Sequence, residues 1–286
     1  MRFFAVACFV VALGAAEPGY DVLIRGARVA DGAGGPWFAA DVAIRGDTIA
    51  AVGMLGGAGA RIVIDARGLV AAPGFIDIHT HARAGIFEVP TADNYTRQGV
   101  TTLMEGNDGS SPVPLGPFLE KVAALRPAPN FGMFAGQGSI RAAVIGLEDR
   151  QATPAEIARM RELAGEAMRQ GAFGLSTGLF YVPGNFTPTE EVIELARVVG
   201  RMGGIHISHM RDEASGILDS VRETIRIGEE GGLPTQITHH KIIGAAYWGR
   251  SAETLRLVEE ARAAARRCTT PSPRRMWSGS CATRLP

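Results

Sequence analysis

The six histidines of this 286-residue chain are the residues whose type and spacing most clearly indicate chemistry. Imidazole nitrogens bind transition metals and exchange protons near neutral pH. If strands end at these residues and run parallel, their carboxyl ends meet on one face, where barrel enzymes build their active sites. The grouping therefore predicts a metal centre assembled from distant parts of the sequence. The histidines fall at three places, each at the end of an apolar segment that predicts a strand: His79 and His81, His206 and His209, and His239 and His240.

The segment His79-Thr80-His81 is the most specific part of this pattern. Alternate residues of a strand point to the same side, so its two imidazoles can bind one cation. His209 and His239 each end a later strand. We expect all four histidines to bind metal in the same centre.

Two histidines are not expected to be ligands. His206 lies three residues before His209, so it should face away from the centre or lie deeper, in a structural role. His240 alternates with His239, which predicts packing or a supporting contact.

A centre of neutral imidazoles usually includes an anionic ligand that holds or bridges the ions. The second predicted strand of the α/β part ends in the sequence Glu105-Gly106-Asn107-Asp108-Gly109. Asp108 is the candidate ligand, and Glu105 is a weaker one. The alternative for Asp108 is a turn residue ahead of Gly109.

The elements that must position these residues alternate between strand and helix after Pro73, an order typical of parallel α/β proteins. Helices are predicted to begin at capping boxes at residues 153–156 and 187–190, and further helices to span residues 215–230 and 251–265. The predicted fold class is α/β, with the ligands at strand ends. Six apolar segments ending in polar residues predict strands at residues 75–81, 100–108, 131–139, 173–178, 204–210 and 235–241.

Residues 17–72 follow a different pattern. Short β-like segments at residues 21–25, 41–45, 48–52 and 61–65 are separated by Gly-rich turns. They predict a small N-terminal β-sandwich.

The α/β part is shorter than a closed (β/α)8 barrel, which needs eight strands. Residues 73–265 predict about six βα units, so we expect a truncated barrel. Residues 266–286 contain no acidic residue and lose helical and strand periodicity. They predict an aberrant tail that results from truncation or a shifted reading frame, and a natural disordered tail is the alternative.

The composition indicates a globular protein, with 46% hydrophobic and 20% charged residues and equal numbers of basic and acidic residues. This balance favours a small-molecule substrate over nucleic acid. Residues 1–16 have a basic start, an apolar run and a small-residue end, which predicts a cleaved signal peptide. We expect export to the periplasm or medium, without stable membrane association after cleavage.

Six motifs together resemble the D-aminoacylase (N-acyl-D-amino-acid deacylase) branch of the amidohydrolase superfamily, over about residues 20–265. The resemblance implies a metal-dependent hydrolase built as a distorted (β/α)8 barrel beside a small β-sandwich formed from both chain ends. The motifs are residues 21–47 with their Gly-Asp turn, the segment from Pro73 to His81, Gln98-Gly99-Val100-Thr101-Thr102, Gly174-Leu175-Ser176-Thr177-Gly178-Leu179, Ser208-His209-Met210-Arg211-Asp212-Glu213 and His239-His240-Lys241.

The resemblance also implies one or two zinc ions. It assigns the tight zinc ligands to Asp108, His209 and His239, and a second, weaker position to His79 and His81. Relatives often have Cys where this chain has Asp108.

Further departures and substrate residues follow from the same resemblance. Lys241 matches a substrate-contacting lysine, and Tyr181 lies in a segment similar to an active-site rim loop. Gln137 stands where many relatives have His. The family's general base, an aspartate at the end of the eighth strand, has no counterpart here, because the last carboxylate is Glu260. We therefore expect amide hydrolysis of N-acyl-D-amino acids that is impaired in this chain.

Two other functions stay open. The first is a cyclic amidase related to hydantoinase or dihydroorotase. Such enzymes usually have a carboxylatable lysine on the fourth strand, where this chain has Ser176-Thr177-Gly178. The second is a non-catalytic remnant that still binds metal.

Overall fold

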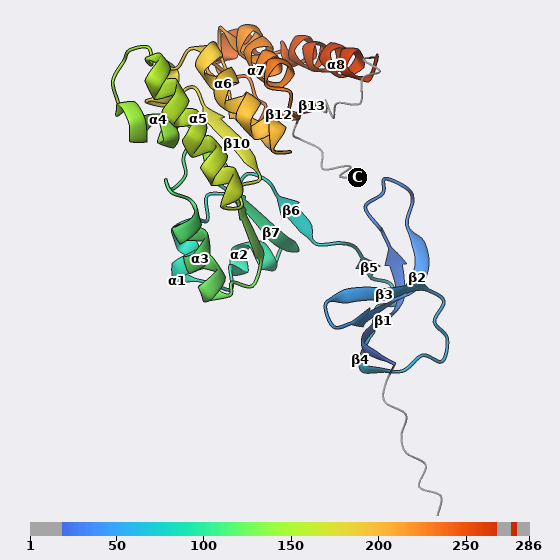
Figure 1. The fold of residues 1–286 in the computed structure, drawn as a ribbon. Helices are drawn as coiled ribbons and strands as arrows, with labels where there is room; N and C mark the ends of the chain where they lie inside the picture. The colour runs from blue at the N-terminus through green and yellow to red at the C-terminus, as the bar shows by residue number, and fades with distance from the viewer. Residues whose placement is uncertain (1–18, 268–275, 279–286) are drawn as a thin grey trace, which may run out of the picture. The chain divides into compact units, whose positions relative to one another are not determined.

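The computed structural model describes residues 19–267 and 276–278 (Figure 1). The chain divides between Pro73 and Gly74 into two compact units. The signal peptide predicted at residues 1–16 and most of the predicted tail at residues 266–286 lie outside the described residues. Within the described residues, no helix is long and apolar enough to cross a membrane.

The described part of the first unit forms a single five-stranded sheet in the order β3-β2-β1-β4, with β5 also paired to β1. A two-residue turn at Gly46-Asp47 joins β2 to β3, and Gly46 there has a φ of 61°. The small β-sandwich predicted at residues 17–72 stays a prediction; among the described residues of this unit, β4 and β5 both pair with β1 in parallel. The strands are β1 (Tyr20–Val29), β2 (Phe38–Arg45), β3 (Thr48–Gly53), β4 (Ala60–Asp65) and β5 (Val70–Ala71).

The second unit is built on parallel strands in chain order, as in a (β/α) barrel. One sheet has the order β6-β7-β8 and the other β9-β10-β11-β12-β13, and only Phe134 separates β8 from β9. A strand lies in each of the six predicted segments, but the segment at 131–139 divides into β8 and β9 and ends in α4. The prediction that His79 and His81 lie on a strand is wrong, because β6 ends at Asp77, and β12 likewise ends at Ile237, before His239. The strands are β6 (Phe75–Asp77), β7 (Val100–Glu105), β8 (Asn130–Met133), β9 (Ala135–Gly136), β10 (Gly174–Gly178), β11 (Ile205–His209), β12 (Thr235–Ile237) and β13 (Met276–Ser278).

Strand β13 lies inside the segment predicted to lack strand periodicity. It pairs with β12 in parallel register, with Thr235 opposite Met276. The described sheet therefore continues one strand beyond the six that the sequence indicated.

Helices connect the parallel strands, and α4, α6 and α7 contact the strands that precede or follow them (Figure 1). Buried Leu175 of β10 belongs to the same hydrophobic core as Met160, Val192 and Leu195 from the helices. This core fixes the sheet whose carboxyl ends carry the candidate ligands. The helices are α1 (Gly85–Glu88), α2 (Asp93–Thr96), α3 (Gly116–Leu125), α4 (Gln137–Ile145), α5 (Pro154–Arg169), α6 (Thr189–Arg201), α7 (Ile217–Gly231) and α8 (Ser251–Arg267), with 3-10 turns η1 (Gly184–Phe186) and η2 (Ala245–Tyr247).

One predicted capping box is confirmed and the other is wrong. Thr153 and Glu156 exchange both capping hydrogen bonds at the start of α5. At the start of α6 the N-cap is Pro188, without a side-chain cap. The Thr187 hydroxyl is engaged elsewhere, because it accepts a hydrogen bond from Gln137 Nε2 at 3.1 Å.

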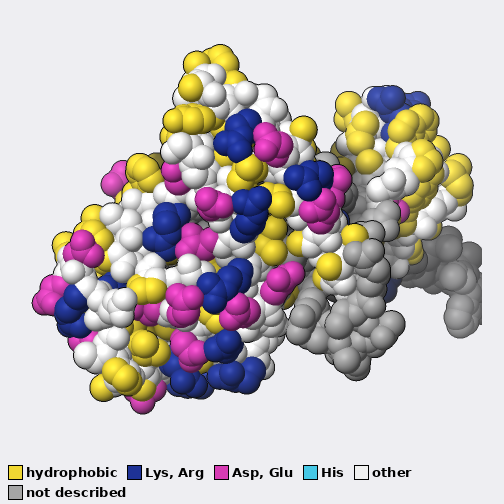
Figure 2. All heavy atoms as spheres, turned by 90° about the horizontal axis from the view of Figure 1, so that it is seen from above, with side chains coloured by type: hydrophobic (Ala, Val, Ile, Leu, Met, Phe, Trp, Pro, Cys, Tyr) yellow, Lys and Arg dark blue, Asp and Glu magenta, His cyan; other side chains and the backbone are white. Residues whose placement is uncertain are grey.

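Basic and acidic side chains are interspersed on the face of the molecule seen in Figure 2. Ion pairs at the surface of the described residues include Arg226 with Glu190 at 2.9 Å and the partly buried pair of Arg197 with Glu194 at 2.5 Å. Solvent-accessible pairs of this kind each contribute little to stability.

A buried ion pair joins α4 to α6. Arg141 Nη1 lies 2.7 Å from Glu191 Oε2, and the two side chains are 0% and 3% exposed. Arg141 Nη2 also donates to the carbonyl oxygen of Arg150 at 2.5 Å. Removing one partner of such a pair leaves an uncompensated buried charge.

We predict that Glu191→Ala lowers the free energy of unfolding by about 3 to 5 kcal/mol. The matched change Glu162→Ala breaks the exposed Arg159–Glu162 pair, which is 2.8 Å long, and should cost less than about 1 kcal/mol. Urea denaturation of both variants measures the difference. Equal losses in the two variants would contradict the buried-pair assignment.

Candidate metal centre

The segment with His79 and His81 follows β6 and is anchored through the residue between them. Thr80 Oγ1 donates to Glu105 Oε1 at 2.8 Å, and the backbone N–H of Ala82 donates to the same oxygen. Burial raises the pKa of Glu105. Glu105, the weaker ligand candidate, therefore faces this backbone and supports the two histidines.

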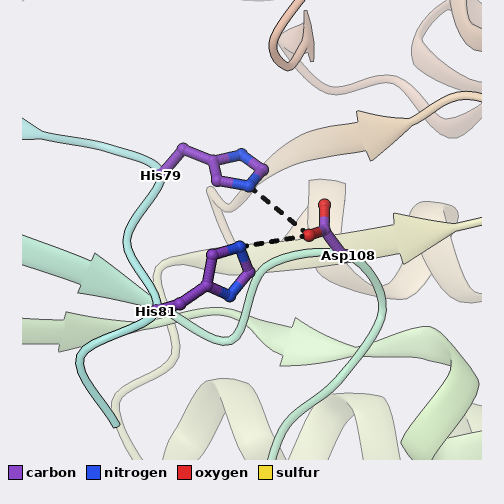
Figure 3. A group of neighbouring side chains, drawn as sticks. All are labelled: His79, His81 and Asp108. Atoms are coloured by element: carbon purple, nitrogen blue, oxygen red, sulfur yellow. Dashed lines mark ion pairs between the residues drawn. The ribbon is translucent and has the colours of Figure 1, made fainter. Parts of the chain in front are cut away.

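Both histidines of this segment point to Asp108 (Figure 3). His79 Nε2 and His81 Nε2 each lie 3.4 Å from Asp108 Oδ2. The side chain of His79 is mostly buried, whereas that of His81 is 67% exposed.

The other oxygen of Asp108 faces a second pair of histidines. His209, the last residue of β11, places Nδ1 at 3.5 Å from Oδ1, and His239, just after β12, places Nε2 at 3.7 Å. These two ring nitrogens are 2.8 Å apart. The structure thus brings together all five residues that the sequence predicted as ligands.

The turn that carries Asp108 depends on close backbone packing. Asp108 has a φ of 56°, in the left-handed region where Asp is tolerated. A Cβ on Gly178 would lie 2.1 Å from the Asp108 carbonyl oxygen, and one on Gly136 would lie 2.5 Å from the carbonyl oxygen of Gly109. Glycines in β9 and β10 therefore allow the turn to lie against the sheet.

The charge of Asp108 is stabilised by its neighbours. Burial opposes its ionisation, but His209, His239 and His79 hold the pKa of its carboxyl well below the usual range. In turn Asp108, with a further contribution from Glu213, raises the pKa of His239 to about 9.

The donor atoms fit a metal ion. They form two groups whose ligand atoms all lie within 4.8 Å of one another: His79, His81 and Asp108, and Asp108, His209 and His239. Asp108 Oδ1 is buried and has no hydrogen-bond partner within the described residues. Imidazoles with one carboxylate are donors that zinc prefers. The set can hold one ion in either group or one in each, with Asp108 common to both.

His206 is structural, as the sequence predicted. Its ring is fully buried, with Nε2 2.9 Å from Thr177 Oγ1 and Nδ1 3.4 Å from Thr235 Oγ1. Burial lowers the pKa of His206 to about 3. His240 has a partly buried ring whose pKa burial also lowers, and its supporting role stays a prediction.

The two residues predicted to contact substrate lie beside the centre. Tyr181 Oη is 3.3 Å from His209 Nδ1. Lys241 Nζ is 3.1 Å from His239 Nδ1 and 2.6 Å from Glu213 Oε2. Contact with a substrate stays a prediction for both.

Glu213 also contacts the centre, with its carboxylate 3.0 Å from His239 Nδ1, and was not predicted from the sequence. Its only signal was a place in the motif that begins at Ser208. The spacing of four residues after a strand-end histidine does not predict which side chain an acidic residue contacts, because the contact depends on how the loop folds.

Comparisons with known proteins agree with this geometry. Residues 62–260 match the model of the amidohydrolase family Amidohydro_3. The chain is 42% identical over 267 residues to the D-aminoacylase of Alcaligenes xylosoxydans xylosoxydans, covering 85% of this chain and 55% of that protein. A solved D-aminoacylase is 38% identical, with a TM-score of 0.82 over 91% of this chain and 58% of that one.

A second solved relative was studied with a metal. The N-acyl-D-glutamate deacylase of Bordetella bronchiseptica, complexed with zinc and a phosphonate inhibitor, is 33% identical, with a TM-score of 0.83. The match covers 91% of this chain and 58% of that one. The chain thus spans a little over half the length of the relatives it matches.

We predict that Asp108→Ala weakens zinc binding more than about 100-fold, because loss of an outer partner alone weakens it 10- to 100-fold. Both ligand groups lose their shared member in this variant. Asp219→Ala, at a carboxylate whose side chain is 88% exposed, is the matched control and should bind zinc normally. Elemental analysis and chelator competition measure the affinity, and normal binding by Asp108→Ala would show that Asp108 is a turn residue only.

Proposed function

This chain belongs to the amidohydrolase family, in the branch of D-aminoacylases and N-acyl-D-amino-acid deacylases, and we propose that it takes part in zinc-dependent hydrolysis of N-acyl-D-amino acids. The observation that carries the proposal is the convergence of four histidines on Asp108 at the carboxyl ends of parallel strands. The chain spans a little over half the length of these relatives, so the catalytic activity that they have as whole enzymes is here a proposal.

The proposed zinc ligands are the two groups that share Asp108. Bound there, zinc would lower the pKa of a water molecule to about 7 and polarise the scissile carbonyl. His209 and His239 lie deeper than His81, so their group is the better shielded from solvent.

Tyr181 is proposed to donate a hydrogen bond to the substrate. Burial, together with the charges of Asp108 and Glu213, raises the pKa of its phenol, so the hydroxyl keeps its proton at neutral pH. Its position 3.3 Å from His209 supports a contact with the carbonyl oxygen of the scissile amide.

Lys241 is proposed to bind the carboxylate that N-acyl amino acids carry. Its ammonium is half-exposed and close to His239, so it offers positive charge at the edge of the centre. The charge pair with Glu213 holds the flexible side chain near that position.

Proton transfer is the part of the reaction that the described residues do not supply. The family resemblance implies an aspartate at the end of an eighth strand, and no described strand follows β13. General acid–base catalysis typically contributes 10²- to 10⁴-fold. We propose that this chain alone hydrolyses its substrate slowly.

We predict zinc-dependent release of D-methionine from N-acetyl-D-methionine, at least about 100-fold slower than a typical turnover of roughly 10 s⁻¹. The assay compares the D-substrate with N-acetyl-L-methionine and hydantoin, with Asp108→Ala as the inactive control. Preferential hydrolysis of hydantoin would favour the cyclic amidase, and zinc binding with no hydrolysis would favour a metal-binding remnant. A D-specific rate near 10 s⁻¹ would contradict the missing proton-transfer group.

A further inference from the structure

Glu213 lies behind two of the candidate ligands, on the side opposite Asp108. Its carboxylate oxygens are 3.0 Å from His239 Nδ1 and 4.0 Å from His209 Nε2. The other nitrogen of each ring faces Asp108, at 3.7 Å for His239 Nε2 and 3.5 Å for His209 Nδ1. Each imidazole therefore lies between two carboxylates, and the contact of Glu213 with His239 is the shortest of the four.

The position of Glu213 is itself fixed. Its side chain is only 6% exposed, and its backbone carbonyl accepts a hydrogen bond from the N–H of Ile243 at 2.8 Å. This bond ties the loop after β11, which carries Glu213, to the loop after β12, which carries His239. The backbone that carries this buried carboxylate is therefore held by both loops.

The second oxygen of Glu213 is paired with a cation, because Lys241 Nζ lies 2.6 Å from Oε2. A charged acceptor at the back of an imidazole fixes the tautomer and orientation of the ring and increases the basicity of the front nitrogen.

We propose that Glu213 is a positioning residue of the metal centre, which aligns His239 directly and His209 through the same carboxylate so that their front nitrogens converge beside Asp108. This inference rests on the metal binding in the proposed function and does not depend on the substrate. One acidic side chain then orients two ligands from neighbouring strand ends.

A competing role for Glu213 is to neutralise Lys241, whose Nζ is 2.6 Å away. Lys241 is 47% exposed, so water can solvate its charge if Glu213 is lost. Lys241→Met removes the contacts of Lys241 with both Glu213 and His239 Nδ1 and keeps the Glu213 carboxylate beside His239. It therefore tests whether the charge pair with Lys241 accounts for the effect of losing Glu213.

The experiment measures zinc affinity by chelator competition and the visible spectrum of the Co²⁺-substituted full chain. Glu213→Ala should bind zinc 10- to 100-fold more weakly, and its Co²⁺ bands should shift because the ligand rings are no longer held. Glu213→Gln keeps the shape and an acceptor for His239, so it should recover part of the affinity and also serves if the alanine variant does not fold.

Asp212→Ala is the matched control. Asp212 is the adjacent carboxylate in the same loop, and it accepts hydrogen bonds from the backbone N–H groups of Ala214 and Gly216. A general disturbance of the loop would therefore affect both alanine variants alike, whereas we expect Asp212→Ala to change zinc affinity less than threefold.

The outcomes are distinct. Weaker zinc binding and altered Co²⁺ bands in Glu213→Ala, with near-normal Asp212→Ala and Lys241→Met, support positioning. Normal affinity and spectrum in Glu213→Ala and Glu213→Gln, or equal losses in Glu213→Ala and either Asp212→Ala or Lys241→Met, would overturn it. If the chain does not hydrolyse N-acyl-D-amino acids, these zinc affinities stay unchanged. The positioning role of Glu213 and the proposed substrate are therefore tested independently.

Discussion

Burying a carboxylate is unfavourable unless the charge is paired, and Asp108 is a mostly buried carboxylate surrounded by four imidazoles. Its two oxygens face different pairs of histidines, which come from the ends of β6, β11 and β12. The centre therefore exists only when the carboxyl ends of strands from both parallel sheets of the second unit lie together. Assembly of the ligands thus depends on the fold of this unit.

The same requirement explains the sequence around the strand ends. The Asp108 turn can reach the middle of the sheet because β9 and β10 present glycines, Gly136 and Gly178, where any side chain would overlap its backbone. Ser176 strengthens the contact, since its hydroxyl accepts a hydrogen bond from the N–H of Gly109 at 3.2 Å. Gly136, Gly178 and Ser176 have no evident chemical role in the sequence, but they determine the position of Asp108.

The features that sequence could predict are those that depend on local periodicity. Six strands, the start of α5 at Thr153 and the convergence of the strand-end histidines followed from such patterns. The features that were missed depend on long-range pairing. The parallel pairing of β4 and β5 with β1 joins segments distant in the sequence, and β13 is recognisable only by its pairing with β12. Thr187 matched a capping pattern, but tertiary contact with Gln137 engaged its hydroxyl.

The two ligand pairs are positioned by different physical means. On one side, Thr80 and Glu105 anchor the backbone of a segment, and the end residue His81 remains largely exposed. On the other side, a charged side chain behind the rings, Glu213, orients His239 and lies near His209. Anchoring the backbone fixes where a ring starts but leaves its torsions free, whereas a contact at the back nitrogen fixes the ring itself. His209 and His239 combine burial with a contact at the back of the ring, so they lose less conformational freedom when a metal binds. This pair is therefore more preorganised than His79 and His81.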